Sequence, residues 1–197
     1  MSWRLDLNGK TAQQRHIITN RDKNNKVAVS RTQINVRNYK TSIFIKLGID
    51  EFSNNGVDTI NLYKFFLVNN NFTWFSTNSL NKGMAKNKVD EFNNTIDAGY
   101  NVWIYFCIGS KSGGTNDIMY RAKVSKLVSN KEKIISPDIT NTPNEFSQRK
   151  NYIWIKIYDL KDFNNKMAKD FIVESTGSSL HEIIKKSQFH FGYIKEI

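Results

Sequence analysis

The chain has 197 residues, enough for one domain with a proper core, and its 39% hydrophobic and 13% aromatic residues exclude a disordered protein. Lysine and arginine number 29 against 18 aspartates and glutamates, which gives a formal net charge of +11. This excess favours a polyanionic partner, because lysine and arginine release condensed counterions when they neutralise phosphates. The alternative is a basic protein with no nucleic-acid role.

Cysteine and histidine are too few for the common metal sites. Cys107 is the only cysteine, so no intramolecular disulfide is expected, and three histidines (His16, His181 and His190) do not make a zinc-ligand cluster. We therefore expect no metal and no cofactor. The first ten residues lack the apolar core of a signal peptide, and no apolar run is long enough to cross a bilayer. We expect an intracellular protein, cytoplasmic or nuclear, with no membrane partner.

The basic residues are concentrated in the first quarter of the chain. Residues 1–46 hold 10 lysines and arginines and 2 acids, whereas the remaining 151 residues hold 19 and 16. We predict that residues 1–56 form a basic N-terminal arm or small extension, with short strands at 27–29 and 33–36. A strand pair packed on the main domain is the alternative for this segment. The main domain is predicted to span residues 57–197.

Residues 60–99 show a strand, an extended segment and a helix. Residues 62–68 are rich in aromatic and branched side chains, which predicts a strand, and residues 72–77 predict a short extended segment. Residues 87–98 predict a helix, because Val89, Phe92 and Ile96 recur at helical spacing. Gly99 is expected to end this helix as its C′ residue.

The remainder of the chain is predicted to be mostly β-structure. Residues 102–108 are apolar at every position, which is typical of a central strand, and residues 118–124 are predicted to return as its hairpin partner. After a polar loop over 129–150, residues 152–158 alternate with Ile153, Ile155 and Ile157 on one face. A short helix at 179–184 and a strand at 189–194 follow. Strands outnumber helices, so the predicted class is α+β, built on a curved sheet.

This order of elements resembles the PUA-like superfamily, in particular its YTH and EVE domains, over about residues 60–197. The segment 64–70 is similar to the family's opening strand with its Asn-rich end. Trp74-Phe75-Ser76-Thr77 resembles the Trp-Ser-Thr motif that supplies one wall of a modified-base cage. The later correspondences are the helix that begins at 87–88, the hairpin 102–128, the strand 152–163, and the closing helix and strand within 180–197. The resemblance implies a PUA-like curved sheet or pseudo-barrel with short helices at the strand connections.

Three features depart from the family pattern. Phe75 is inserted between the tryptophan and the Ser-Thr pair. The long loop that carries a second cage tryptophan in YTH proteins has no tryptophan here, and Phe146 is its only aromatic residue. The Gly-Asp that EVE domains often carry before the central strand is Gly99-Tyr100 in this chain.

The resemblance implies a non-enzymatic nucleic-acid-binding module, for DNA or RNA, that flips a methylated or otherwise modified base into an aromatic pocket. EVE-like domains also serve as targeting parts of modification-dependent restriction systems, so a separate effector protein is a further implied partner. The candidate base-binding residues are Trp74, Ser76, Thr77, Asn70, Trp103, Tyr105, Tyr152 and Trp154. The candidate phosphate-binding residues, besides the basic arm, are Lys82, Lys86, Lys111 and Arg121.

Each tryptophan also has a structural interpretation. The strand that contains Trp103 is apolar on both faces, which favours core packing for this side chain. Trp154 faces away from the isoleucine row, where it is either a ligand platform or part of a second core layer. Trp74 lies among Asn, Ser and Thr residues, and this polar setting favours a binding role.

Two other classes of function are compatible with the sequence. A metal-dependent nuclease of the PD-(D/E)xK type would use Asp138, Asp159 and Lys161, since two carboxylates and a lysine can hold Mg²⁺ and activate water. This motif is short and degenerate, and a polar chain of this length often contains one by chance. The other alternative is a non-catalytic protein-interaction module, in which the aromatic strand faces form a protein interface.

Overall fold

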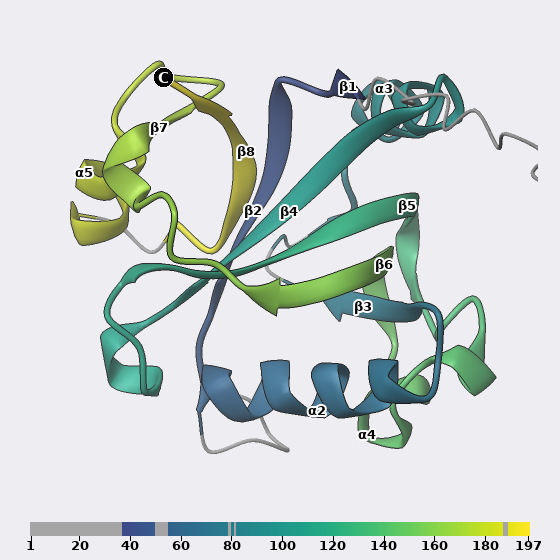
Figure 1. Ribbon diagram of the computed structural model, residues 1–197. Helices are drawn as coiled ribbons and strands as arrows, with labels where there is room; N and C mark the ends of the chain where they lie inside the picture. The colour runs from purple at the N-terminus through teal and green to yellow at the C-terminus, as the bar shows by residue number, and fades with distance from the viewer. Residues whose placement is uncertain (1–36, 50–54, 79, 81, 187–188) are drawn as a thin grey trace, which may run out of the picture. The chain divides into compact units, whose positions relative to one another are not determined.

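The computed structural model describes residues 37–49, 55–78, 80, 82–186 and 189–197. These residues form an α+β fold around a mixed sheet of eight strands (Figure 1). In this described part of the chain, no helix combines the length and the apolar character needed to cross a membrane. The strands predicted at 27–29 and 33–36, and most of the predicted basic arm, lie outside the described residues.

The sheet has the strand order β3-β6-β5-β4-β2-β8-β7, and the short β1 pairs with β4. Its neighbours are antiparallel, except that β4 runs parallel to both β1 and β2. The strands are β1 (Arg37–Asn38), β2 (Thr41–Leu47), β3 (Thr73–Thr77), β4 (Tyr100–Ile108), β5 (Asp117–Ile134), β6 (Asn151–Asp162), β7 (Phe171–Val173) and β8 (Phe191–Glu196).

Helices lie on both faces of this sheet. On the first face, α2 packs against β3 and β6, and α3 packs against β4 and β5. On the second face, α5 packs against β7 and the 3₁₀ helix η3. The helical elements are α2 (Gly56–Val68), η1 (Ser110–Ser112), α3 (Lys86–Asp97), η2 (Ile139–Asn141), α4 (Asn144–Ser147), η3 (Ala168–Asp170) and α5 (Leu180–Lys186).

The strand predicted at 62–68 is wrong, because these residues form the second half of helix α2. Asn55 caps this helix, since its side chain accepts a hydrogen bond from the backbone N–H of Asp58 at 2.8 Å. The buried residues Thr59, Ile60 and Tyr63 recur at helical spacing. Aromatic and branched composition suggested a strand, but burial of this helical face decides the structure. The likeness of 64–70 to a family opening strand is therefore also wrong.

The domain boundary predicted at residue 56 lies too far along the chain. Strand β2 is in the interior of the sheet, where it pairs with β4 on one side and β8 on the other. Its residues Ile43, Phe44 and Ile45 are essentially fully buried. Residues 41–47 are therefore part of the main domain and not of an arm.

Most other predicted elements are confirmed. Helix α3 is followed by its C′ residue Gly99, whose φ of 83° is the left-handed conformation that favours glycine. Strand β4 is interior, as its apolar sequence predicts, and β5 is its antiparallel partner. The loop predicted over 129–150 is partly wrong, because β5 continues to Ile134 and the rest contains η2 and α4.

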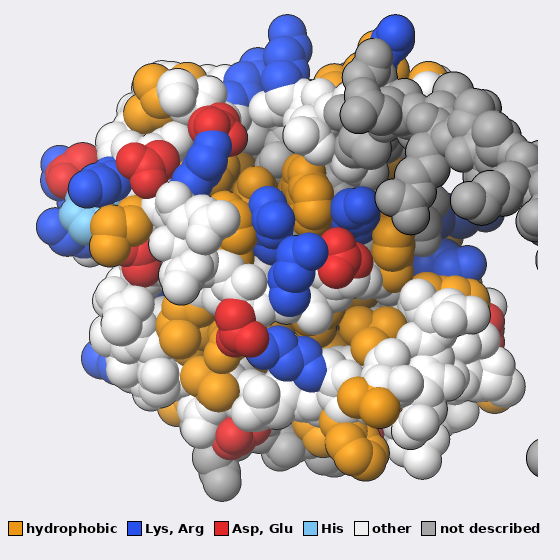
Figure 2. Space-filling view, in the orientation of Figure 1, with side chains coloured by type: hydrophobic (Ala, Val, Ile, Leu, Met, Phe, Trp, Pro, Cys, Tyr) orange, Lys and Arg blue, Asp and Glu red, His pale blue; other side chains and the backbone are white. Residues whose placement is uncertain are grey.

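The two faces of the sheet have separate hydrophobic cores. On β4, Val102, Ile104 and Phe106 enter the first core, under α2 and α3. The alternate residues Tyr105 and Cys107 enter the second core. The second core lies under residues 163–186, which contain η3, β7 and α5 and which we call the C-terminal cover. Because the cover reaches only part of the second face, aromatic and basic side chains of the sheet remain accessible beyond its edge (Figure 2).

Candidate functional site

A cleft of about 590 Å³ lies on the second face of the sheet, beside the C-terminal cover. Its floor comes from β2, β4, β5 and β6, and its sides come from the cover, from β8 and from the β1–β2 turn. Figure 2 shows lysine and arginine side chains gathered at the middle of this face, with apolar side chains around them. We call this cavity the basic cleft.

The pairing of β4 with β5 brings the cleft's aromatic and basic residues together. Trp103 pairs with Lys123, and Tyr105 pairs with Arg121. Directly paired residues project from the same face of a sheet, and residues two apart on a strand do so as well. All four side chains therefore share the second face, where they line the basic cleft.

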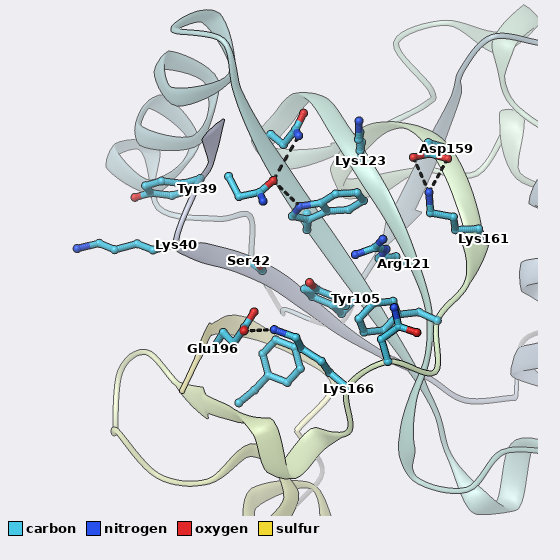
Figure 3. Close-up of a pocket in the computed structure, with 16 residues that line it drawn as sticks. Tyr39, Lys40, Ser42, Tyr105, Arg121, Lys123, Asp159, Lys161, Lys166 and Glu196 are labelled. Atoms are coloured by element: carbon cyan, nitrogen blue, oxygen red, sulfur yellow. Dashed lines mark hydrogen bonds and ion pairs between the residues drawn. The ribbon is translucent and has the colours of Figure 1, made fainter. Parts of the chain in front are cut away.

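A β-bulge in β6 adds a further cation to the cleft. Lys123 pairs with Tyr158 and Arg121 pairs with Lys161, so three residue steps on β6 lie opposite two on β5. The extra residue lies in the stretch that contains Asp159, whose φ of 53° is left-handed. In a regular strand, residues three apart, such as Tyr158 and Lys161, would project from opposite faces of the sheet. The bulge therefore places Lys161 beside Arg121 in the cleft (Figure 3).

Arg121 is held between two aromatic rings. Its guanidinium carbon lies 4.3 Å from the ring centroid of Trp103 and 4.5 Å from that of Phe163. Such cation–π contacts fix the plane of the guanidinium. The Nε–H of Arg121 is buried and has no hydrogen-bond partner among the described residues. An unpaired buried donor costs about 1–3 kcal/mol, so this group is poised for an acceptor that the described residues do not supply.

Tyr105 and Trp103 support this arginine from the floor of the cleft. Tyr105 is buried between Phe163 and Phe171, at centroid distances of 5.3 and 5.0 Å. Burial raises the pKa of Tyr105, and the positive charge of Arg121 offsets part of that rise. Trp103 donates its indole N–H to Asn38 Oδ1 at 3.2 Å, which ties it to β1. The aromatic residues of the floor are thus engaged in holding a cation.

The charge balance of the cleft is positive. Its described lining includes five cations (Lys40, Arg121, Lys123, Lys161 and Lys166) and two carboxylates (Asp159 and Glu196). Asp159 pairs with Lys161 at 3.0 Å, and Glu196 pairs with Lys166. Within the described residues, Lys40, Arg121 and Lys123 form no ion pair with a carboxylate. These three are the cations of the described lining that no described carboxylate neutralises, which makes them candidates for binding an anionic ligand.

Three of the predicted site residues meet in this cleft, namely Trp103, Tyr105 and Arg121. The structure places the other candidate phosphate ligands elsewhere. Lys82 is exposed outside the cleft, Lys86 pairs with Asp90 on the surface of α3, and Lys111 is exposed on η1. Arg121 is therefore the one predicted phosphate ligand in the described lining of the cleft.

The other predicted base-binding aromatics do not line the basic cleft. Trp74 lies on β3, which pairs with β6, and its side chain is only 5% exposed despite its polar neighbours in sequence. Trp154 is fully buried and donates its indole N–H to the carbonyl of Ile134 at 3.0 Å, so it is a core residue. Tyr152 is half-buried under Lys133, and Asn70 donates its side-chain N–H to the carbonyl of Phe66 at the end of α2. The predicted cage is not assembled from these four residues.

Ser76 and Thr77 line a second, smaller cavity of about 330 Å³. In this second cavity the rings of Tyr63 and Phe146 are stacked, with centroids 5.0 Å apart and planes at 5°. Arg149 lies over Phe146 at 5.1 Å. Phe146, the only aromatic of the predicted long loop, is thus brought to the Ser-Thr pair by folding.

The three residues of the nuclease hypothesis are not brought together. Asp138 caps η2, where its carboxylate accepts hydrogen bonds from the backbone N–H groups of Thr140 and Asn141. Hydrogen bonds from Thr140 and Asn141 lower the pKa of Asp138. Asp159 and Lys161 line the basic cleft, and Asp138 does not. Among the described residues, no group of three or more His, Cys, Asp or Glu side chains could hold a metal ion.

Several cleft residues are not predicted as phosphate ligands from the sequence. Lys40, Lys123 and Lys166 come from separate segments, and single lysines in a basic chain do not stand out, whereas Lys161 is proposed only for the nuclease alternative. Alternation along β5 could have placed Lys123 on the face of Arg121, because the two residues are separated by one. Phe163 follows β6 directly, and only the folded structure shows that it covers Arg121.

Comparison with protein-family models, with curated proteins and with solved structures finds no significant match for this chain.

Proposed function

We propose that this protein is a nucleic-acid-binding module that holds phosphate groups in the basic cleft. The observation that carries this proposal is the fixed guanidinium of Arg121, with an unpaired buried Nε–H, next to Lys123. A planar guanidinium presents a fork of donors that matches the oxygens of a phosphate, and a nearby ammonium adds charge. The formal net charge of +11 supports a polyanionic partner over a small neutral ligand.

The finer proposal is a PUA-like reader of a modified base. It rests on the order of the strands and helices after α2 and on the likeness of residues 74–77 to the Trp-Ser-Thr motif. With Trp74 and Trp154 buried, the second cavity is the better place for an extruded base. Its aromatic side chains and its Ser76 and Thr77 hydroxyls offer stacking and hydrogen-bonding groups.

Salt dependence of oligonucleotide binding tests the nucleic-acid proposal. The double variant Lys40→Gln/Lys123→Gln removes two free cations of the cleft, and Lys82→Gln/Lys111→Gln removes two exposed cations outside it. The slope of log affinity against log salt should become shallower by about 0.7–0.9 per lost contact for the first variant only. Equal slopes for both variants would show that the basic cleft is not the binding site. No binding to any oligonucleotide would contradict the proposed nucleic-acid-binding function.

Methylated oligonucleotides test the finer proposal. A single methyl group enclosed in the second cavity should add about 1 kcal/mol by apolar burial, which is of order fivefold to tenfold in affinity. The variant Ser76→Ala should reduce this preference and leave the salt slope unchanged, because Ser76 lies outside the basic cleft. Equal affinity for methylated and unmethylated strands, over the common base methylations, would contradict the reader proposal.

A further inference from the structure

The cations of the basic cleft are not arranged as a continuous track. Asp159 with Lys161 lies on one side of Arg121, and Glu196 with Lys166 lies on the other (Figure 3). A strand that ran past Arg121 in both directions would carry its neighbouring phosphates toward these two carboxylates. Like charges at close range are unfavourable, so the flanking acids disfavour an internal segment of a strand.

The cleft is also closed at its bottom, next to Arg121. Tyr105, Phe163 and Phe171 are each at most 5% exposed, and they close the cleft beneath and beside the guanidinium. By contrast, Lys40 is exposed at the other side of the cleft, on the β1–β2 turn. A ligand can therefore enter past Lys40 and end at Arg121.

A terminal phosphate has the chemistry that this position accepts. A phosphate monoester carries about −1.5 to −2 charges near pH 7 and three free acceptor oxygens, whereas an internal diester carries one charge. Arg121 and Lys123 together offer a planar fork and an ammonium from adjacent positions on one strand face.

We propose that the basic cleft holds the terminal phosphate monoester of a nucleic-acid strand, with Arg121 as the bidentate ligand and Lys123 as the second cation. This inference rests on the proposed nucleic-acid-binding function and narrows it to strand ends. The rest of the strand leaves the cleft past Lys40.

Three oligonucleotides of one sequence test the inference, with a 5′-phosphate, a 3′-phosphate or hydroxyl groups at both ends. Fluorescence anisotropy should show that one phosphorylated oligonucleotide binds about tenfold more tightly than the hydroxyl form, which corresponds to one charge-assisted hydrogen-bonded contact. The preference should decline as the pH falls from 7.5 to 5.5, because the second pKa of a phosphate monoester is about 6. This pH measurement uses the unaltered protein and needs no variant to fold.

Two variants test whether Arg121 is responsible for the preference for the phosphorylated oligonucleotide. Arg121→Lys keeps the charge and loses the fork, so it should abolish the preference and leave most of the salt slope. Lys169→Gln, an exposed position on η3 outside the cleft lining, should leave the preference unchanged. Thermal melting shows whether Arg121→Lys folds. If that variant does not fold, Lys123→Gln takes its place in the test, and we expect it to reduce the preference for the phosphorylated oligonucleotide.

The outcomes separate this inference from the proposed function. Equal binding of all three oligonucleotides, with affinity still dependent on Arg121, overturns the strand-end inference and leaves nucleic-acid binding intact. Binding of none of them overturns both. Equally tight binding of a phosphoserine peptide overturns the inference as well, because the cleft would then select the monoester and not a strand.

Discussion

The two faces of the sheet use the same alternation for different purposes. Along β4, every second side chain enters the first core, where α2 and α3 bury it completely. The side chains between them project to the second face, where the C-terminal cover buries Cys107 but leaves Trp103 at the edge of the basic cleft. One strand thus stabilises the fold with one face and presents cation-holding aromatics with the other. The extent of the cover decides which residues of the second face are structural.

Truncation in the first core should have the largest effect. Phe106 is fully buried and its ring lies 5.2 Å from that of Phe75. Phe106→Ala should lower the free energy of unfolding by about 3–5 kcal/mol, because the cavity cannot be refilled by its packed neighbours. Chemical denaturation monitored by circular dichroism measures this loss. A loss below 1 kcal/mol would mean that the first face is not the main source of stability.

Truncation of Trp103, three positions earlier on the same strand, should cost less. Trp103 is half-buried at the edge of the second core, and it makes cation–π contacts with Arg121 and Lys123 and a hydrogen bond to Asn38. We expect Trp103→Ala to lower the free energy of unfolding by about 1–2 kcal/mol and to weaken oligonucleotide binding, because Arg121 loses a supporting ring. The same denaturation and anisotropy measurements apply. If Trp103→Ala lowers the free energy of unfolding as much as Phe106→Ala does, the two faces of the sheet contribute equally to stability and the comparison fails.

An ionic network joins helix α3 to the β7–β8 edge of the sheet, and it predicts a dependence of stability on pH. Lys88 of α3 pairs with Glu91 at 3.0 Å and with Glu174, just after β7, at 2.9 Å, and Glu174 also pairs with Lys195 at 3.1 Å. Burial alone would raise the pKa of Glu174, but hydrogen bonds from Lys88 and Lys195 outweigh it and lower the pKa. A lowered pKa contributes stability above the ordinary carboxyl value, and that stability is lost as the pH falls below it.

The variant Glu174→Gln should therefore lose on the order of 1 kcal/mol at pH 7 and show a flatter decline in stability below pH 5. Urea midpoints from pH 3 to pH 7 measure both effects. Glu182→Gln, which breaks an exposed pair with Lys186 on α5, is the matched control and should leave the profile near that of the parent. Parallel profiles for Glu174→Gln and the parent would show that this network does not contribute to the pH dependence of stability.

The bulge at Asp159 should give the smallest change. Asp159→Gly keeps the left-handed backbone, since glycine adopts it without strain, and its higher unfolded-state entropy offsets this gain. We expect stability to stay within about 1 kcal/mol of the parent and oligonucleotide affinity to rise on the order of twofold, because the cleft loses a carboxylate. Asp159→Ala is the control and should be less stable than Asp159→Gly, because its Cβ is strained at this φ. Equal stability of the two variants would argue against backbone strain at the bulge.

The sequence predicts the elements in which local pattern and burial agree. The α3 helix follows from the spacing of Val89, Phe92 and Ile96 and from its terminal Gly99, and β6 follows from its alternating isoleucines. Helix α2 does not follow, because its composition suggests a strand and only its packing against β3 and β6 shows the helical face. In that segment, burial against the sheet determines the secondary structure, and local composition does not.

The candidate site is less predictable than the fold. Trp103, Tyr105 and Arg121 are predicted individually, but their grouping depends on the register between β4 and β5. The position of Lys161 depends on a bulge, and one residue more or less would turn it to the opposite face. Trp74 misleads because its neighbours in sequence are polar, whereas its neighbours in space enclose it. Register and bulges are properties of strand pairs, which a single sequence does not specify.

The pairing of β2 has a kinetic consequence. Ile43 pairs with Ile104 of β4 in parallel, and Thr41 pairs with Lys195 of β8, so the centre of the sheet joins segments that are far apart along the chain. Contacts of such sequence separation close slowly, because the chain entropy of the long intervening loops is lost before the contacts form. Ser42, Tyr105 and Glu196 line the basic cleft from these same three strands. We therefore expect ligand binding to appear only with the slowest folding phase. During synthesis, binding should require that β8 has already emerged from the ribosome.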